Sequence, residues 1–332
     1  MNKKAVVLFS GGLDSILAIK LMLEQGVDAH ALYFSSVFNQ GDARHNEEMM
    51  RKRAEALGVP ITIIDIAQDQ LELIRDPKHG MGRNMNPCID CRIMTLKKAK
   101  EVMDKMGASF IVTGEVIGER PMSQRKDALL LIDKKSGLGG LIVRPLSAKL
   151  LEPTAPEKKG VVDREKFLDI KGRKRDKQIG LAKKLGVNDY PNPSGGCLLT
   201  DAGFSNRLRD LLKYNSGVDA GDLKLLKTGR HFRISDKLKL MVGRDEKDNN
   251  ALLSLARPGD HVFDVLDIPS AVGLARGVTE EKDIEKAAVI MARYSDAKRK
   301  EVKVSYKVLP LEEWREIMVN PASESLISSA RI

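Results

Sequence analysis

Three cysteines are the first residues whose type and spacing indicate chemistry. Cys88 and Cys91 are close enough in NPCIDC to bind one metal centre, and Cys197 follows much later in PSGGCLL, beside Gly195 and Gly196. Three interpretations stay open: a zinc site that recruits a fourth ligand, a persulfide with a second, resolving thiol, and an iron–sulfur cluster with one open iron. Inert buried thiols fit poorly, because these cysteines lie in a Pro-led loop and a Gly-Gly turn.

A second chemical cluster follows the first apolar run of the chain, AVVLF at residues 5–9. It reads SGGLDS and consists of Ser10, Gly11, Gly12, Leu13, Asp14 and Ser15. The glycines allow close backbone approach, and a helix that starts here presents free amides and the positive end of its dipole to a phosphate. A carboxylate beside a phosphate needs an intervening Mg²⁺, so Asp14 indicates a Mg²⁺–ATP site. The segment lacks both the Walker A ending and the GxGxxG spacing.

Alternating strand and helix signals must position these two clusters. The pattern predicts a doubly wound α/β domain with a parallel sheet, because apolar runs of strand length alternate with helix-length segments. The expected strands are residues 5–9, 28–35, 61–66, 108–114, 127–133 and 141–146. Helices are expected over 16–25 and 93–106, so the cysteine pair is predicted to lie in the loop before the second of these.

The character of the chain changes after residue 150. A proline-containing stretch leads into a basic segment whose densest part, KGRKR, is predicted to bind RNA phosphates through Lys171, Arg173, Lys174 and Arg175. A solvated helix surface is the alternative. Further on, strand-like runs and a helix near 279–294 indicate an α+β domain. We therefore expect an ATP-binding domain over 1–150, a basic adaptor with the third cysteine over 151–203, and a smaller domain over 204–332.

Composition limits the classes of function. The net charge of +10 and a pI near 9.3 favour a polyanionic partner such as nucleic acid. No apolar stretch is long enough for a signal peptide or a membrane span, so we expect a cytoplasmic protein without a membrane partner. An odd number of cysteines in such a chain makes a disulfide framework an unsuitable interpretation.

SGGLDS resembles the PP-loop of the N-type ATP pyrophosphatase superfamily. Segments 114–124, 144–157, 172–186 and 190–201 look like the 2-thiouridylase and 4-thiouridylase group of PP-loop tRNA thiolation enzymes. The resemblance implies that ATP is cleaved between its α and β phosphates, that a uridine carbonyl oxygen takes the AMP, and that sulfur displaces it. It also implies nucleotide contacts at Tyr33, Phe34, Ser35 and Gly114.

The same resemblance bears on the cysteines and on the partners. Enzymes of this group carry either a persulfide pair or a 4Fe–4S cluster on a CxxC motif and one further cysteine, and the CxxC favours the cluster on Cys88, Cys91 and Cys197. The implied partners are tRNA and a sulfur donor, either sulfide or a sulfur-carrier or cysteine desulfurase system. Near the C-terminus, TGRHFRI and MVGRDEKDNN look similar to the NFACT RNA-binding module.

Two other functions compete with thiolation. One is a PP-loop ligase or amidotransferase that uses a nitrogen nucleophile, and the other is a nucleotide-binding RNA adaptor without catalysis. No THUMP or rhodanese domain is recognisable, so the uridine position stays open. The weaker site candidates are of three kinds. Glu115, Arg120 and Arg125 are candidates for substrate contacts, and His45 and His79 for catalytic bases. His231 is a candidate for contact with RNA.

Overall fold

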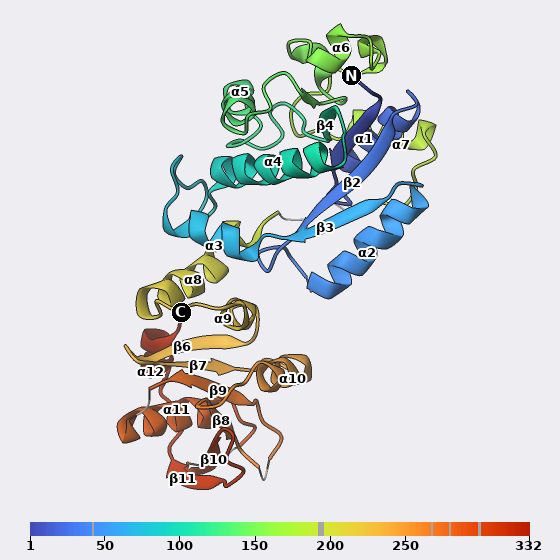
Figure 1. The fold of residues 1–332 in the computed structure, drawn as a ribbon. Helices are drawn as coiled ribbons and strands as arrows, with labels where there is room; N and C mark the ends of the chain where they lie inside the picture. The colour runs from blue at the N-terminus through green and yellow to red at the C-terminus, as the bar shows by residue number, and fades with distance from the viewer. Residues whose placement is uncertain (42, 192–195, 267, 279, 298–299) are drawn as a thin grey trace. The chain divides into compact units, whose positions relative to one another are not determined.

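The chain forms two compact units, residues 1–200 and 201–332, in a computed structural model (Figure 1). The structure describes residues 1–332 except 42, 192–195, 267, 279 and 298–299, so Gly195 lies outside the described residues. Residues 151–200 group with the first unit. The division into three segments at 150 and 203 stays a prediction.

A five-stranded parallel sheet organises the first unit, in the order β3-β2-β1-β4-β5. The chain builds outward from β1 in one direction and then returns to its other side, so β1 and β4 meet where the strand order reverses. In such sheets ligands bind at the carboxyl ends of the strands at this point. The elements are β1 Lys4–Leu8, α1 Leu13–Leu23, β2 Asp28–Ser35, α2 Ala43–Ala56, β3 Ile61–Asp65, α3 Ala67–Arg75, α4 Cys88–Lys105, β4 Phe110–Thr113, α5 Lys126–Lys135 and β5 Ile142–Val143.

Helices cover both faces of this sheet because its strands alternate buried side chains between two cores. Ala5 and Val7 of β1 face the core that contains α1. Val6 and Leu8 face the core that contains α4. The doubly wound α/β class predicted from the sequence is confirmed.

Shorter elements complete the first unit. They are the 3₁₀ turns Ala148–Leu150, Arg164–Lys166 and Leu198–Thr200 and the helices α6 Ala155–Lys158 and α7 Asp176–Lys184. Buried Ser147 holds two distant segments together, because its hydroxyl donates to the Ile170 carbonyl (2.6 Å) and accepts from the Ile117 amide (3.1 Å).

Two expectations for this unit are wrong. Residues 127–133 form the middle of α5, since Ala128, Leu129 and Ile132 are buried at helical spacing while Leu130 is 55% exposed. Helix α4 begins earlier than expected, so Cys88 and Cys91 lie in its first turn and not in a loop.

The second unit contains a six-stranded sheet in the order β11-β10-β8-β9-β7-β6, and all of its strand pairs are antiparallel. This confirms a separate α+β domain. Its elements are α8 Ala202–Tyr214, α9 Ala220–Leu225, β6 Arg230–Ser235, β7 Leu238–Val242, α10 Glu246–Ser254, β8 His261–Asp264, β9 Gly273–Gly277, α11 Glu281–Arg293, β10 Val302–Val308, β11 Arg315–Val319 and α12 Glu324–Ala330.

The sequence missed several of these elements. The run before TGRHFRI is helical because Asp219 and Asp222 form a capping box at the start of α9. Strand β9 begins and ends with glycine, which has low strand propensity, yet a side chain at Gly273 would meet the Met291 sulfur at 2.4 Å. Among the described residues, no helix is long and apolar enough to cross a membrane.

Candidate active site

The SGGLDS segment forms the turn between β1 and α1. Gly11 adopts a positive φ of 69°, and a side chain there would lie 2.4 Å from the Met50 side chain, so this position requires glycine. Gly12 caps α1, which puts Asp14 in its first turn. The Ser15 hydroxyl donates to the Gly12 carbonyl (2.8 Å) and accepts from the Ser10 amide (3.3 Å), which holds the turn closed.

The end of β4 lies directly against this turn. A Cβ atom at Gly114 would come within 2.6 Å of the Asp14 carbonyl, so only glycine permits the approach. The structure therefore brings Gly114 to the predicted phosphate turn, at the place where the strand order reverses.

The predicted adenine contacts lie at the carboxyl end of β2, next to β1. The Tyr33 ring packs into the α1 core and Phe34 packs against the α4 core, so these two side chains point to opposite faces of the sheet. Burial raises the pKa of the Tyr33 hydroxyl, which accepts a hydrogen bond from Asn39 (3.3 Å). Ser35 is buried. Their role as nucleotide contacts stays a prediction.

The three cysteines are free, half-buried thiols that tertiary contacts bring to the same edge. The segment at Cys197 docks on the loop after β2, where the Phe38 carbonyl accepts from the Cys197 thiol (3.5 Å) and from the Leu198 amide (2.9 Å). The loop before α4 holds the same segment from the other side, through the bond from the Met85 amide to the Leu199 carbonyl (3.1 Å).

A chain of hydrogen bonds connects Cys91 with Cys197. The Gln70 side-chain amide of α3 donates to the Cys91 sulfur (3.3 Å) and accepts a very short bond from the Ser36 hydroxyl. Ser36 also accepts from the Phe38 amide (3.1 Å), whose carbonyl receives the Cys197 thiol. Nothing in the sequence singled out Gln70 or Ser36, because this role arises only from their tertiary neighbours.

The thiols also affect one another electrostatically. Burial raises the pKa of Cys197 to about 12, and the neighbouring Cys91 and Cys88 add to this shift. Burial and Cys91 raise the pKa of Cys88, while the Arg120 guanidinium opposes the increase. The three thiols are therefore close enough to influence one another's protonation. Thiolates are the ligands that an iron–sulfur cluster needs, but among the described residues no three His, Cys, Asp or Glu side chains form a group that could hold a metal ion, so the cluster stays a prediction.

Arg120 acts electrostatically on both the cysteines and the SGGLDS turn. Its guanidinium opposes the burial-driven rise in the pKa of Asp14 as well as that of Cys88. A Cβ atom on Gly196, next to Cys197, would be 3.4 Å from Arg120 Nη1. Of the weaker candidates, Arg120 is the one that acts on both Asp14 and Cys88, and its contact with substrate stays a prediction.

Glu115 is held in a network of ion pairs and hydrogen bonds. Its carboxylate pairs with Arg92 (2.8 Å) and Arg144 (2.9 Å) and accepts from the Thr113 hydroxyl (3.0 Å). Arg144 also pairs with Asp133 (2.6 Å). These ion pairs occupy both carboxylate oxygens of Glu115.

The other weak candidates are dispersed. Arg125 is exposed and pairs with Asp127 (2.9 Å). His45 is exposed on α2. His79 Nδ1 lies 2.6 Å from Asp90 in the first turn of α4, where it fixes the loop before the cysteines. The prediction that His231 contacts RNA is wrong, because the ring is buried, bonds to the Thr228 carbonyl (2.9 Å) and has a pKa held well below its usual value by burial.

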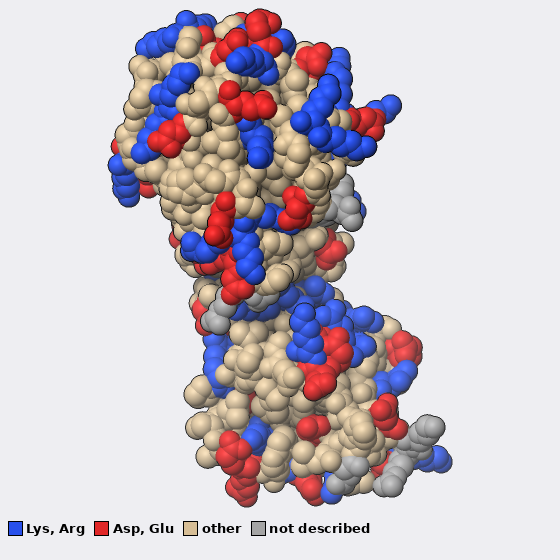
Figure 2. Space-filling model, turned by 90° about the vertical axis from the view of Figure 1, so that its right-hand side faces the viewer, with Lys and Arg blue, Asp and Glu red and all other residues tan. Residues whose placement is uncertain are grey.

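The residues of the predicted RNA-binding run KGRKR differ in their exposure. Lys171, Arg173 and Lys174 are exposed, whereas Arg175 is half-buried and affects the pKa of Asp14. On the face drawn in Figure 2, Lys and Arg side chains are interspersed with Asp and Glu. RNA binding by the run stays a prediction.

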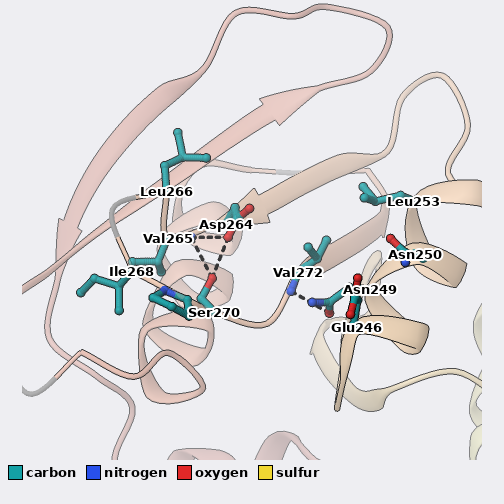
Figure 3. Close-up of a pocket in the computed structure, with 11 residues that line it drawn as sticks. Glu246, Asn249, Asn250, Leu253, Asp264, Val265, Leu266, Ile268, Ser270 and Val272 are labelled. Carbon is teal, nitrogen blue, oxygen red and sulfur yellow. Dashed lines mark hydrogen bonds between the residues drawn. The ribbon is translucent and has the colours of Figure 1, made fainter.

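A separate cavity of about 470 Å³ lies within the second unit. In Figure 3, Glu246, Asn249, Asn250 and Leu253 approach it from α10, and Asp264 and Ser270 bond to each other on the other side (2.6 Å). Glu246, Asn249 and Asn250 belong to the segment MVGRDEKDNN, whose resemblance to the NFACT RNA-binding module was predicted from the sequence.

Both units are similar to known protein families. Residues 1–149 match the model of the family described as thiamine biosynthesis protein (ThiI), and residues 229–330 match the NFACT protein RNA binding domain. Residues 1–149 of the first unit are therefore similar to the ThiI family. Both resemblances predicted from the sequence are thereby confirmed.

Curated relatives match only part of their own length. A tRNA-specific 2-thiouridylase MnmA of Sulfurimonas denitrificans is 31% identical over 35% of this chain and 36% of its own. A "Probable tRNA sulfurtransferase" of Thermococcus kodakarensis is 27% identical over 55% of this chain and 41% of its own. The chain thus spans about a third to two fifths of these relatives' length.

Two solved structures resemble the chain weakly. One is a 4-thiouridine synthetase–RNA complex with bound ATP, 23% identical with a TM-score of 0.34 over 55% of this chain and 51% of that one. The other is an NH₃-dependent NAD synthetase of Campylobacter jejuni, 15% identical with a TM-score of 0.35 over 68% and 83%. Scores this low say nothing about the chemistry of this chain.

Proposed function

We propose that this protein is an ATP-dependent tRNA sulfurtransferase that replaces a uridine carbonyl oxygen by sulfur. The observation that carries the proposal is that Arg120 acts electrostatically on Asp14 of the SGGLDS turn and on Cys88 and Cys197, whose thiols are free. The ThiI-family match of the same unit and the names of the curated relatives support it. A ligase that transfers nitrogen would not need the three cysteines.

The reaction balances in two steps. The uridine carbonyl oxygen attacks the α-phosphorus of ATP, the bond to the β-phosphate oxygen breaks, and pyrophosphate leaves. A sulfur nucleophile then adds to the activated carbon, and AMP departs with the original oxygen. Amides of the turn and the hydroxyls of Ser10 and Ser15 would bind the phosphates, and Asp14 would hold Mg²⁺, which offsets their charge.

Sulfur delivery is assigned to the three cysteines. Cys88, Cys91 and Cys197 would hold a 4Fe–4S cluster, which supplies an open iron for sulfide when bound. The second mechanism is a persulfide on Cys91 or Cys197. Its terminal sulfur would transfer to uridine while the other thiolate attacks the inner sulfur, and an external dithiol would reduce the resulting disulfide.

tRNA and a sulfur donor are the proposed partners. Exposed Lys171, Arg173 and Lys174 would contact the tRNA backbone, and the second unit would contribute through its NFACT RNA binding domain.

The test is a reaction with an unmodified tRNA transcript, Mg²⁺–ATP and sulfide under anaerobic conditions, after reconstitution with iron. We expect pyrophosphate release and a thiouridine in the nuclease digest, detected by mass spectrometry. Cys197→Ala should abolish thiouridine, and bound iron with broad visible absorbance would support the cluster. Pyrophosphate release that yields an aminated product and tolerates Cys197→Ala would support the ligase. Absence of ATP cleavage with any tRNA would support the non-catalytic adaptor.

A further inference from the structure

Buried polar atoms without partners are concentrated beside the SGGLDS turn. Within the described part of the chain, Asp14 Oδ1, Arg175 Nε and both amide atoms of Gln178 are buried without a hydrogen bond of ordinary geometry, although the Gln178 side chain is near enough to Asp14 to lower its pKa. Gln178 is 0% exposed. Because a buried, unpaired polar group costs about 1–3 kcal/mol and is rare in native proteins, such a concentration indicates a place where a ligand supplies the partners.

The backbone explains how residues far apart in sequence reach this place. Ile117 pairs with Lys171 in a short parallel bridge, and the Gly172 amide donates to the Ile117 carbonyl (2.7 Å). The segments that follow, 118–120 and 172–175, therefore start side by side. Since Gly114 presses against Asp14, both segments lie next to the phosphate turn.

The charges around Asp14 are mixed in a way that suits a metal–polyphosphate ligand. Burial raises the pKa of Asp14, and Arg175 and then Gln178 oppose that rise. Burial and Asp14 likewise raise the pKa of Glu119, opposed by Arg120 and Arg175. Carboxylates beside phosphates call for a divalent cation, whereas guanidinium groups bind phosphate oxygens directly.

We propose that Arg175 and Gln178 are nucleotide-binding residues: the Arg175 guanidinium and the Gln178 amide NH₂ donate to phosphate oxygens of ATP held at the SGGLDS turn. This rests on the proposed function and corrects one of its sequence-derived assignments. The KGRKR run is then divided between two ligands. Lys171, Arg173 and Lys174 point to solvent and are left for RNA, while Arg175, which caps α7, serves the nucleotide.

The test is equilibrium binding of Mg²⁺–ATP by the full chain without RNA, measured by calorimetry. Arg175→Ala should weaken binding about ten- to a hundredfold, the effect of losing a charge-assisted hydrogen bond. Lys184→Ala removes an exposed cation from the other end of α7 and should leave the affinity for ATP unchanged. Arg173→Ala should weaken binding of unfractionated tRNA but not of ATP, and Arg175→Ala should do the reverse.

Gln178→Met separates a ligand-binding role from a structural one. Because the native amide makes no hydrogen bond of ordinary geometry, a side chain of similar size without polar atoms should leave the melting temperature of the ligand-free protein equal or higher. The same variant should bind Mg²⁺–ATP about tenfold more weakly.

The outcomes distinguish this inference from the proposed function. If the wild-type chain does not bind Mg²⁺–ATP, the proposed function fails and the inference fails with it. If the wild-type binds and both Arg175→Ala and Gln178→Met bind equally well, only the inference is overturned. If Arg175→Ala does not fold, Gln178→Met decides: a lower melting temperature with unchanged ATP affinity would assign Gln178 to the fold.

Discussion

Replacing Glu115 by glutamine should strongly destabilise the first unit. Glu115 is 5% exposed, and its carboxylate lies 2.8 Å from an Arg92 nitrogen and 2.9 Å from an Arg144 nitrogen. Burial alone would raise the pKa of this carboxyl group, but the two guanidiniums and the hydrogen bonds from Arg144 and Thr113 outweigh it and lower the pKa to about 2.

The magnitude follows from linkage between protonation and folding. The ordinary pKa is 4.5, so the charged form is favoured by about 2.5 pH units, or roughly 3 kcal/mol. Because the folded pKa lies below the unfolded one, this stability is complete above about pH 4.5 and is lost as the pH falls toward 2. Breaking a buried pair by removing one charge costs about 3–5 kcal/mol, so we expect Glu115→Gln to lose that amount at pH 7.

The assay is urea unfolding between pH 7 and pH 3, followed by circular dichroism and by fluorescence. Trp314 is the only tryptophan and lies in the second unit, so fluorescence separates the two transitions. Glu165→Gln makes the same chemical change at an exposed pair with Lys149 and should cost under about 1 kcal/mol. The reasoning is refuted if Glu115→Gln costs no more than this control, or if its deficit does not shrink as the pH falls.

Three further predictions concern other parts of the molecule. Gln70→Leu and Ser36→Ala should each lower the free energy of unfolding in urea by about 1–3 kcal/mol. The double variant should lose less than the sum of the two, because both residues belong to one series of hydrogen bonds, and strictly additive losses would contradict that coupling. Asp210→Asn leaves buried Lys239 (3.1 Å away) without its counter-charge and should cost about 3–5 kcal/mol in the Trp314 transition, whereas an unchanged midpoint would contradict this. Joint replacement of the exposed cations Lys171, Arg173 and Lys174 by alanine should weaken the salt dependence of tRNA binding. The slope of the logarithm of the binding constant against the logarithm of the salt concentration should decrease in magnitude by about 0.9 for each phosphate that the variant no longer neutralises, and an unchanged slope would place RNA elsewhere.

Local patterns predicted much of the fold and named candidate residues for the site. Apolar runs and glycine turns determine the parallel sheet and the SGGLDS turn, because strand propensity and positive φ values are properties of short segments. Patterns failed where burial decided the outcome. The apolar residues 127–133 predict a strand, whereas the burial pattern, with Leu130 exposed, is that of a helix. Strand β9 was missed because it begins and ends with glycine.

The sequence by itself determined a phosphate turn, three cysteines able to do chemistry and a basic run. Only the tertiary structure decided which residues accompany them. Gln70 reaches Cys91 through the packing of α3 on α4, and the bridge at Ile117 and Lys171 brings the segment containing Arg175 to Asp14. The physical reason is that hydrogen bonds and charges act over a few ångströms in space, whereas these partners lie between about 20 and 160 positions apart in the chain.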